Sequence, residues 1–232
     1  MKTGAYILTY NCVDMIRKGL LGPLQYFDET CIIYSEQPIH GKRGYDDLTR
    51  EALEAVAVRT NILMWQGGRP EEDIRNYALK FLYDKGCSYV MCIDEDELYT
   101  PDGISQIKAH LKKRPGTFGL RGDSIRTFWG SESKEVWERP KHTPVIVTSN
   151  GTFHTDRRCA PIDGVFSLNG TTMDHYSWVR PRYYLQEKLS CYSHALEVPP
   201  MWMDNVVIPG LVSDSGPFRF EGLRTIEGRE NL

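Results

Sequence analysis

Four consecutive carboxylates, Asp94-Glu95-Asp96-Glu97, are the residues whose types and spacing most directly suggest chemistry. They follow an apolar run at 88–93, and carboxylates held this close together repel one another. A magnesium or manganese ion relieves such repulsion, because hard cations bind several oxygen ligands and commonly take phosphate oxygens as well. The turn therefore predicts a metal site for a phosphate-bearing ligand. The alternative is a structural capped turn, in which the Asp carboxylates accept backbone N–H groups before the next helix.

The elements before this turn alternate between strands and helices. Four short runs predict strands, at residues 5–9, 31–35, 61–65 and 88–93; the first is expected to be buried and the last is fully apolar. The clearest helix precedes the last of these strands and is predicted to end at Gly86. Its apolar face is formed at helical spacing by Ile74, Tyr77, Ala78, Phe81 and Leu82. Alternation of this kind is typical of a parallel sheet, and ligands bind beyond the carboxyl ends of parallel strands. The acidic turn stands at such an end.

Other helices are predicted to flank this sheet. One spans 13–27 with a break at Gly22-Pro23, and another begins at Thr49 with Leu53, Val56 and Ala57 on one face. A third begins at Thr100-Pro101 with Ile104, Ile107 and Leu111 inward, and a fourth covers 181–194. Residues 117–178 carry short strands and turns instead. The predicted fold class is therefore α/β, with a mostly parallel central sheet flanked by helices and a more β-rich second half.

Composition narrows the function only partly. The 232 residues are 41% hydrophobic and 25% charged, as in an ordinary globular protein, and the net charge of −3 shows no basic excess. A nucleic-acid partner is thus neither supported nor excluded. The six cysteines form no CxxC pair, which argues against a structural zinc site. No apolar run is long enough for a signal peptide or a membrane span, so we expect a cytoplasmic protein of a bacterium or a phage-infected cell.

Several motifs in this order resemble one enzyme family. The Arg75-Asn76 helix, the Gly86 turn, the strand and the acidic turn resemble the central block of glycosyltransferases of the GT-A fold, of the family-2 type. Thr9-Tyr10-Asn11 is similar to the end of their first strand. The segment 174–180, with Lys188 and His194 downstream, resembles a His-x-Ser-Trp-x-Arg … Lys … His pattern in a subset of them.

This resemblance implies a fold and a reaction. The fold would be a Rossmann-type GT-A domain spanning 1–232, in which 1–115 bind the nucleotide sugar and 116–232 form the acceptor side. The reaction would be metal-dependent transfer of a hexose or pentose from a nucleotide sugar, a UDP-sugar foremost, to a hydroxyl acceptor. The acceptor, whether a sugar, a lipid, a protein or a modified DNA base, stays open.

The resemblance also assigns the metal ligands. Asp94 would lie near the ribose and the metal, and Asp96 would bind the Mn²⁺ or Mg²⁺ that bridges the α- and β-phosphates. His175 would be a third ligand from the second half of the chain, with a hydrogen-bonded core histidine as the alternative. The metal would act as a Lewis acid that stabilises the leaving diphosphate.

The donor nucleotide would be held by residues at the ends of the first two strands and on the central helix. These are Tyr10, Asn11, Glu36, Arg75, Asn76 and Asp94. For Arg75 and Asn76 the alternative is an exposed arginine and a surface amide. The sequence departs from the family at 34–37, where Tyr-Ser-Glu-Gln replaces the usual acidic and Gly-rich turn, so the base specificity stays open.

A catalytic base is the least defined part of the site. Inversion requires a carboxylate that takes the acceptor proton. Asp163 is the candidate, with a turn residue before Gly164 as its alternative, and Asp174 and Glu132 are rivals. Four tryptophans could stack on a sugar or a base or could fill the core: Trp129, Trp137, Trp178 and Trp202.

Three other functions stay open at this point. The acceptor could be a hydroxymethylated base in DNA, contacted by aromatic segments around 126–137 and 180–184. A nucleotidyltransferase is a second possibility, although residues 9–14 lack the glycines of a phosphate-binding loop. The third is a non-catalytic module that binds nucleotide sugars.

Overall fold

A computed structural model of the chain describes its structure in segments. These are residues 1–38, 47–56, 60–65, 70–113, 119–122, 125–129, 131–138, 147–148, 151–155, 158–160, 164–166, 173–191 and 223–225. The predicted base Asp163 and Trp202 lie outside the described residues.

Four parallel strands form the centre of the fold, as predicted. They are β1 (Thr3–Thr9), β2 (Glu29–Ser35), β3 (Asn61–Trp65) and β4 (Tyr89–Asp94), in the spatial order β3-β2-β1-β4. The sheet continues beyond β4 through β9 (Val147–Thr148), β6 (Gly119–Gly122) and β12 (Gly164–Phe166). Of these, β9 is antiparallel to both of its neighbours. Apolar side chains, including Tyr, Met and Ala as well as Ile and Leu, dominate the central strands because both faces of the sheet are covered.

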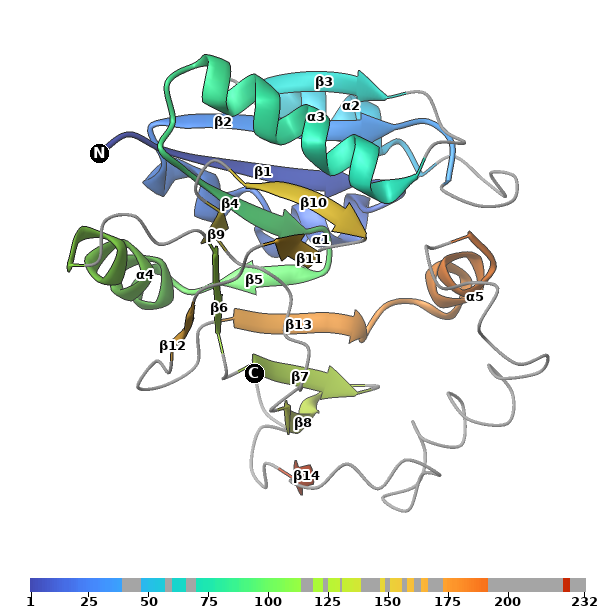
Figure 1. The fold of residues 1–232 in the computed structure, drawn as a ribbon. Helices are drawn as coiled ribbons and strands as arrows, with labels where there is room; N and C mark the ends of the chain where they lie inside the picture. Colours follow the sequence, from blue (N-terminus) through green and yellow to red (C-terminus); the bar gives the residue numbers. More distant parts are fainter. Residues whose placement is uncertain are drawn as a thin grey trace.

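Helices cover both faces of this sheet (Figure 1). They are α1 (Val13–Lys18), the short 3₁₀ helix η1 (Gly22–Tyr26), α2 (Thr49–Val56), α3 (Glu71–Asp84) and α4 (Pro101–Lys113). A further helix, α5 (Arg182–Cys191), lies beyond the end of the strand at 173–178. The predicted helix over 13–27 is thus two separate elements. Gly19 ends α1 with a φ of 101°, a conformation that glycine adopts readily, and Pro23 starts the next turn.

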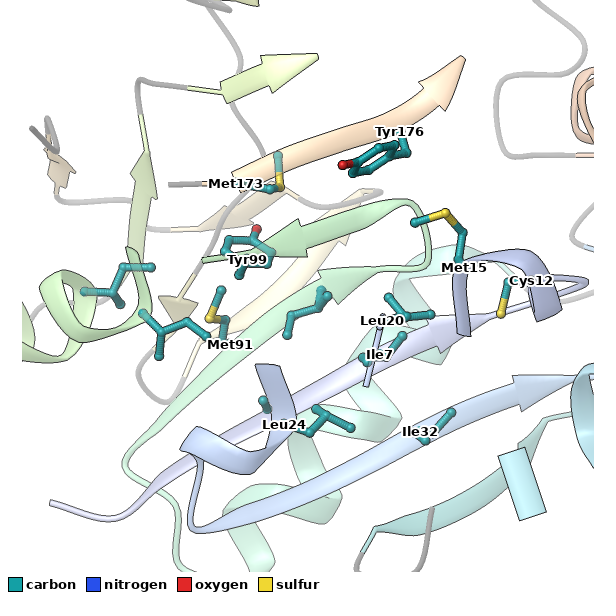
Figure 2. Close-up of a cluster of buried hydrophobic side chains, with 14 of the residues drawn as sticks. Ile7, Cys12, Met15, Leu20, Leu24, Ile32, Met91, Tyr99, Met173 and Tyr176 are labelled. Atoms are coloured by element: carbon teal, nitrogen blue, oxygen red, sulfur yellow. The ribbon is translucent and has the colours of Figure 1, made fainter. Parts of the chain in front are cut away.

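The hydrophobic core has two parts because alternate residues of each strand face opposite sides of the sheet. On one side, Tyr6, Val90 and Cys92 pack against the apolar face of α3. On the other side, the strands pack against α1, η1, α4 and the strand at 173–178. Figure 2 shows this second cluster, with Ile7, Ile32, Met91 and Tyr99 among the labelled side chains.

The buried face of α3 differs from the predicted one. Ile74, Ala78 and Leu82 are buried as expected, but Tyr77 is 43% exposed. The helix is rotated so that Arg75 and Leu79 face the sheet, and Tyr77 instead lies against Trp65 of the edge strand, with ring centroids 5.5 Å apart. Val56 of α2, expected inward, is likewise exposed, whereas the inward residues predicted for α4 are all buried.

A second sheet begins directly after the acidic turn. Its strands are β5 (Glu97–Tyr99), β7 (Ile125–Trp129), β8 (Ser131–Glu138), β13 (Met173–Trp178) and β14 (Leu223–Thr225), in the order β14-β8-β7-β13-β5. The antiparallel pairing of β13 with β5 places His175 opposite Glu97. A small ribbon of β10 (Thr152–Thr155) and β11 (Arg158–Ala160) completes the described strands. The acidic turn therefore joins the two sheets, and residues of the second half of the chain lie beside it.

None of the helices that the structure describes has the length and apolar character needed to cross a membrane.

Candidate functional site

The candidate site lies where the connections of the central sheet change direction. From β1 the chain proceeds to β2 and β3 on one side, and then returns to place β4 on the other side of β1. Ligands of open α/β sheets bind beyond the carboxyl ends of the strands at such a switch point. Leu8 pairs with Asp94, so Tyr10 and Asn11 after β1 lie beside the acidic turn after β4. The structure thus brings together the residues that the sequence placed at these two strand ends.

Asp94 is held by a buried arginine. Arg75, only 2% exposed, donates from Nη2 to Asp94 Oδ1 at 3.0 Å, and its guanidinium also bonds Glu71 and Cys92 Sγ. An arginine buried this deeply requires paired carboxylates. Although burial opposes the charge, Asp94 and Glu71 keep the pKa of Arg75 well above its ordinary value. Arg75 is therefore not an exposed helix residue; it fixes the first carboxylate of the turn. Asn76, its half-buried neighbour, stays a predicted donor contact.

Glu95 points back toward the end of β1. Its Oε2 accepts the backbone N–H of Tyr10 at 2.6 Å, and its Oε1 lies 3.3 Å from Nη1 of Arg180. Burial raises the pKa of this carboxyl to about 8, although Arg180 and the Tyr10 N–H both favour the charged form. Glu95 therefore ties the turn to the end of β1.

Asp96 is buried beneath three residues of the second half. Its Oδ2 accepts hydrogen bonds from Ser177 Oγ at 2.6 Å and from Lys188 Nζ at 2.5 Å, and its Oδ1 lies 3.6 Å from His175 Nε2. Burial works against ionisation, but the charges of Lys188 and His175 hold the pKa of Asp96 well below its usual range. Asp96 is thus an anion in a cluster of donors that come from β13 and α5.

Glu97 has a structural role in this turn. Its Oε2 accepts the backbone N–H of Asp94 at 3.0 Å and the hydroxyl of Tyr99 at 3.2 Å, and the residue is 2% exposed. The four carboxylates therefore divide into two kinds. Glu95 and Glu97 accept backbone N–H groups and hold the turn, although Glu95 also contacts Arg180. The contacts of Asp94 and Asp96 described above are instead with side chains of other elements.

Helix α5 closes the site from the other side. Glu187 Oε1 accepts the hydroxyl of Tyr10 at 2.6 Å and the side-chain amide of Asn11 at 3.0 Å. Asn11 itself adopts a positive φ of 40°, which asparagine tolerates better than most residues, and its carbonyl accepts Arg180 at 2.7 Å. The two predicted nucleotide contacts are therefore anchored to the second half of the chain.

Arg180 connects three of these elements. Its guanidinium bonds both oxygens of Asp14 at 2.8 and 3.0 Å, in addition to Glu95 and the Asn11 carbonyl. Glu36, in contrast, follows β2 and pairs with Arg50 at the surface, at 3.0 Å. Glu36 stays a predicted nucleotide contact, and its surface ion pair adds nothing to the buried network.

Sequence reasoning gave no role to Arg180, Glu187 and Lys188, although two of them stood in the family pattern. The sequence of α5 did carry a signal for these contacts. Tyr184 is three residues before Glu187 and four before Lys188, so the three side chains share one face of the helix. Tyr184 donates to Asp47 at 2.8 Å and lies under the Arg180 guanidinium. This polar face marks the side of α5 that docks on the site.

The expected metal ligands lie at this edge but do not form a metal-binding group. Within the described residues, no set of three or more His, Cys, Asp and Glu side chains is arranged to hold an ion. Lys188 stands against Oδ2 of Asp96, where a cation would bind. His175 Nε2 lies 2.8 Å from Ser177 Oγ and 3.6 Å from Asp96 Oδ1, so this ring nitrogen is in contact with the Asp96–Ser177 pair. As arranged, the side chains do not fit a divalent ion.

The predicted catalytic and stacking residues are less well placed. Asp174 lies in β13 between Met173 and His175 and is half-buried. Since His175 and Ser177 both reach Asp96, strand alternation directs Asp174 away from it. Trp178 lies near Lys188, whose ammonium is 6.0 Å from the ring centroid. Asp174 and Trp178 stay predictions as catalytic and stacking residues.

Comparison with solved structures identifies the fold. TarS of S. aureus matches with a TM-score of 0.51 and 15% identity, over 82% of this chain and 40% of TarS. A structure of TarS 1-349 gives a TM-score of 0.46 at 13% identity, over 82% of this chain and 66% of that one. A structure described as a putative nucleotide-diphospho-sugar transferase from Desulfovibrio desulfuricans gives 0.40 at 13% identity, over 64% of each chain.

The match to TarS with a TM-score of 0.51 shows the fold. The chain has the mixed α/β architecture of GT-A-like nucleotide-sugar transferases, with a central parallel sheet flanked by helices, as predicted. It spans about two fifths of the length of TarS. No protein-family profile and no curated protein matches the sequence.

Proposed function

We propose that this chain is a glycosyltransferase that takes a sugar from a nucleotide-sugar donor and transfers it to an acceptor hydroxyl. One observation carries the proposal: an acidic turn at the switch point of a GT-A-like sheet, with Asp94 and Asp96 each paired to a cationic side chain. A site of mixed charge at the strand ends suits a nucleotide diphosphate, whose ribose hydroxyls seek carboxylates and whose phosphates seek cations.

Each residue at this edge is proposed to contact a different part of the donor. Asp94, whose side chain is 26% exposed, is the most exposed carboxylate of the turn and is proposed to accept a ribose hydroxyl. Tyr10 and Asn11 are held by Glu187 at the end of β1, where the base or ribose would lie. Lys188 is proposed to face the diphosphate. Fixing the donor in this way contributes to catalysis by positioning the sugar against the acceptor.

The fold comparison suggests which nucleotides to try first. TarS, whose fold this chain resembles, has been crystallised in complex with UDP-GlcNAc and with UDP. Uridine nucleotides are therefore the leading probes. Dependence on manganese or magnesium stays a prediction, so each nucleotide is tested with and without the metal.

The test is a thermal-shift screen with UDP, GDP, CDP and their sugars, in Mn²⁺ or in a chelator. A ligand at about 100 times its Kd stabilises the folded state by about 2.7 kcal/mol, which raises the melting temperature of a protein of this size by about 5–10 °C. We expect one nucleotide to give such a shift. The absence of a shift with every nucleotide in both conditions would reject the proposal.

Two variants show whether binding occurs at the turn. Asp94→Asn removes the accessible carboxylate, and we expect it to abolish the shift. Glu71→Gln is a matched control, because it removes another carboxylate from the same arginine without touching the turn. It should keep the shift. Release of pyrophosphate from a nucleoside triphosphate and a sugar phosphate would instead indicate a nucleotidyltransferase.

A further inference from the structure

Lys188 occupies the position at Asp96 that a metal ion would take. Its Nζ lies 2.5 Å from Asp96 Oδ2 and 3.0 Å from Ser177 Oγ, and its side chain is 18% exposed. The contact spans 92 residues of sequence, so it is made by the tertiary fold. A buried carboxylate with a lysine and a serine on one oxygen has satisfied its need for positive charge.

Helix α5 holds this lysine in place. The residue before it, Glu187, accepts hydrogen bonds from Tyr10 and Asn11 at 2.6 and 3.0 Å, so two consecutive side chains dock the helix on the site. The centroid of the Trp178 ring lies 6.0 Å from the Lys188 ammonium. An ammonium fixed between a carboxylate, a hydroxyl and an aromatic ring is a preformed part of the site.

The other carboxylates of the turn are balanced in the same way. Asp94 pairs with Arg75 at 3.0 Å and Glu95 with Arg180 at 3.3 Å. Glu97 accepts an N–H and a hydroxyl. The repulsion that first suggested a divalent ion is therefore relieved within the protein: by Arg75 of α3 at Asp94, by Lys188 of α5 at Asp96, and at Glu95 by burial, which favours the protonated form, together with the contact to Arg180.

Lys188 also retains bonding capacity toward a ligand. An ammonium has three N–H donors. Among the described residues, Asp96 and Ser177 accept two of these hydrogen bonds. The third can donate to an anionic oxygen, and lysine binds phosphate well as a point charge. A diphosphate beside Asp96 would thus meet a cation that the protein itself provides.

We propose that Lys188 serves as the cation of this site, so that the chain binds the diphosphate of its nucleotide donor without a divalent metal. This inference rests on the proposed function and concerns the same site. The arrangement of Asp94, Asp96 and His175 does not fit a divalent ion, and the Lys188 ammonium takes the place of that ion. Removal of the ammonium would make the carboxylates accessible to a metal.

The first measurement needs no nucleotide. Binding of Mn²⁺ is followed by the electron paramagnetic resonance signal of the free ion, in the wild type and in Lys188→Met. Protein and Mn²⁺ are each used at about 100 µM, a concentration near the Kd of a weak metal site. Under these conditions the wild type should leave the signal of free Mn²⁺ unchanged. Lys188→Met, which exposes Asp96, should bind the ion. Strong binding of Mn²⁺ by the wild type at Asp96, lost in Asp96→Asn, would overturn the inference.

The second measurement titrates UDP, or the nucleotide found in the screen, by calorimetry in excess chelator. We expect wild-type binding to be unchanged by the chelator. Lys188→Met should lose about tenfold or more in affinity and recover part of it when Mn²⁺ is added, whereas Lys188→Arg should stay near the wild type. Lys80→Met, a change at an exposed lysine of α3, should have no effect.

The outcomes separate this inference from the proposed function. Nucleotide binding that disappears in chelator would leave the function standing and overturn the inference. No binding of any nucleotide with or without Mn²⁺ would overturn both. If Lys188→Met does not fold because Asp96 is left as an unpaired buried charge, the double variant Asp96→Asn/Lys188→Met removes both charges. It should fold, and it should bind nucleotide about tenfold more weakly with no rescue by Mn²⁺; binding equal to the wild type would contradict the role of Lys188.

Discussion

Lys188 Nζ and Asp96 Oδ2 are 2.5 Å apart, although 92 residues separate them in the chain. The contact joins α5 to the turn after β4, and so joins the second half of the protein to the central sheet. Tyr10 and Glu187 make a similar connection at 2.6 Å. The candidate site is therefore assembled from both halves of the chain, and its carboxylates are in contact with cations contributed by the protein.

Replacement of Arg75 tests the buried pairing that holds Asp94. We expect Arg75→Met to lower the free energy of unfolding by about 3–5 kcal/mol, because it leaves the carboxylates of Glu71 and Asp94 without their buried partner. Urea unfolding measures the change. Lys80→Met is the control on the same helix, since its ion pair with Asp84 is exposed and should contribute little. Equal effects of the two variants would show that Arg75 has no special role.

The ionisation of Glu95 predicts a dependence of stability on pH. Its pKa of about 8 in the folded protein lies above the ordinary value near 4.5, so protonation favours folding. This stabilising contribution is fully present below about pH 4.5, and it is lost as the pH rises through about 8. Glu95→Gln cannot titrate. The unfolding free energy of the wild type minus that of Glu95→Gln should therefore be smaller at about pH 8.5 than at about pH 5. These two pH values lie on either side of most of the titration. A difference that rises over this range would show that the folded protein favours the carboxylate.

Close packing at Gly4 predicts intolerance of a side chain there. A Cβ added at this position would lie 3.0 Å from Cys87 Sγ and 3.4 Å from Leu82 Cβ. We expect Gly4→Val to destabilise the protein by about 1–3 kcal/mol through overpacking. Gly22→Ala is the matched control, because nothing lies within 4 Å of its added Cβ. Thermal or urea unfolding of the two variants checks this, and a neutral Gly4→Val would contradict the close contact between β1 and Cys87.

The link between Tyr10 and Glu187 predicts an energetic coupling between the halves of the chain. In a double-mutant cycle of Tyr10→Phe and Glu187→Gln, we expect a coupling energy of about 1–3 kcal/mol, as for a hydrogen bond to a charged group. The cycle is read from the urea unfolding of the four proteins. Tyr10→Phe and Lys80→Met, which do not touch, should be additive. Additivity of the first pair as well would show that α5 does not dock on β1 through this contact.

The order of elements was predictable because hydrophobic periodicity is local information. The strand at 88–93 and the helix from Pro101 to Lys113 were both confirmed, and both depend on residues close together in the chain. Tyr77 was placed on the wrong side of α3 because an aromatic residue at helical spacing looks apolar. The buried partner of Asp94 is Arg75, and the attraction between these two charges is not part of a hydrophobic pattern.

The site was predictable only in outline. The position of Asp94 to Glu97 at a strand end followed from the alternation of strands and helices, and the resemblance placed His175 near Asp96, where the structure has it at 3.6 Å. The different partners of the four carboxylates could not be predicted, because tertiary contacts decide which groups each of them meets. The contact of Lys188 with Asp96 depends on β13 pairing with β5, a long-range pairing that fixes where α5 begins.

Hydrogen–deuterium exchange with and without the nucleotide sugar that gives the largest thermal shift tests the central claim most directly, because it locates the ligand on the chain. We predict slower exchange in peptides that cover the end of β1 with Tyr10 and Asn11, the turn from Asp94 to Glu97, and the part of α5 with Lys188. Exchange in α4, which lies at the opposite end of the sheet from α5 (Figure 1), should not change. Protection confined to α4 or to other segments, with none at Asp94 to Glu97, would contradict a donor site at the acidic turn.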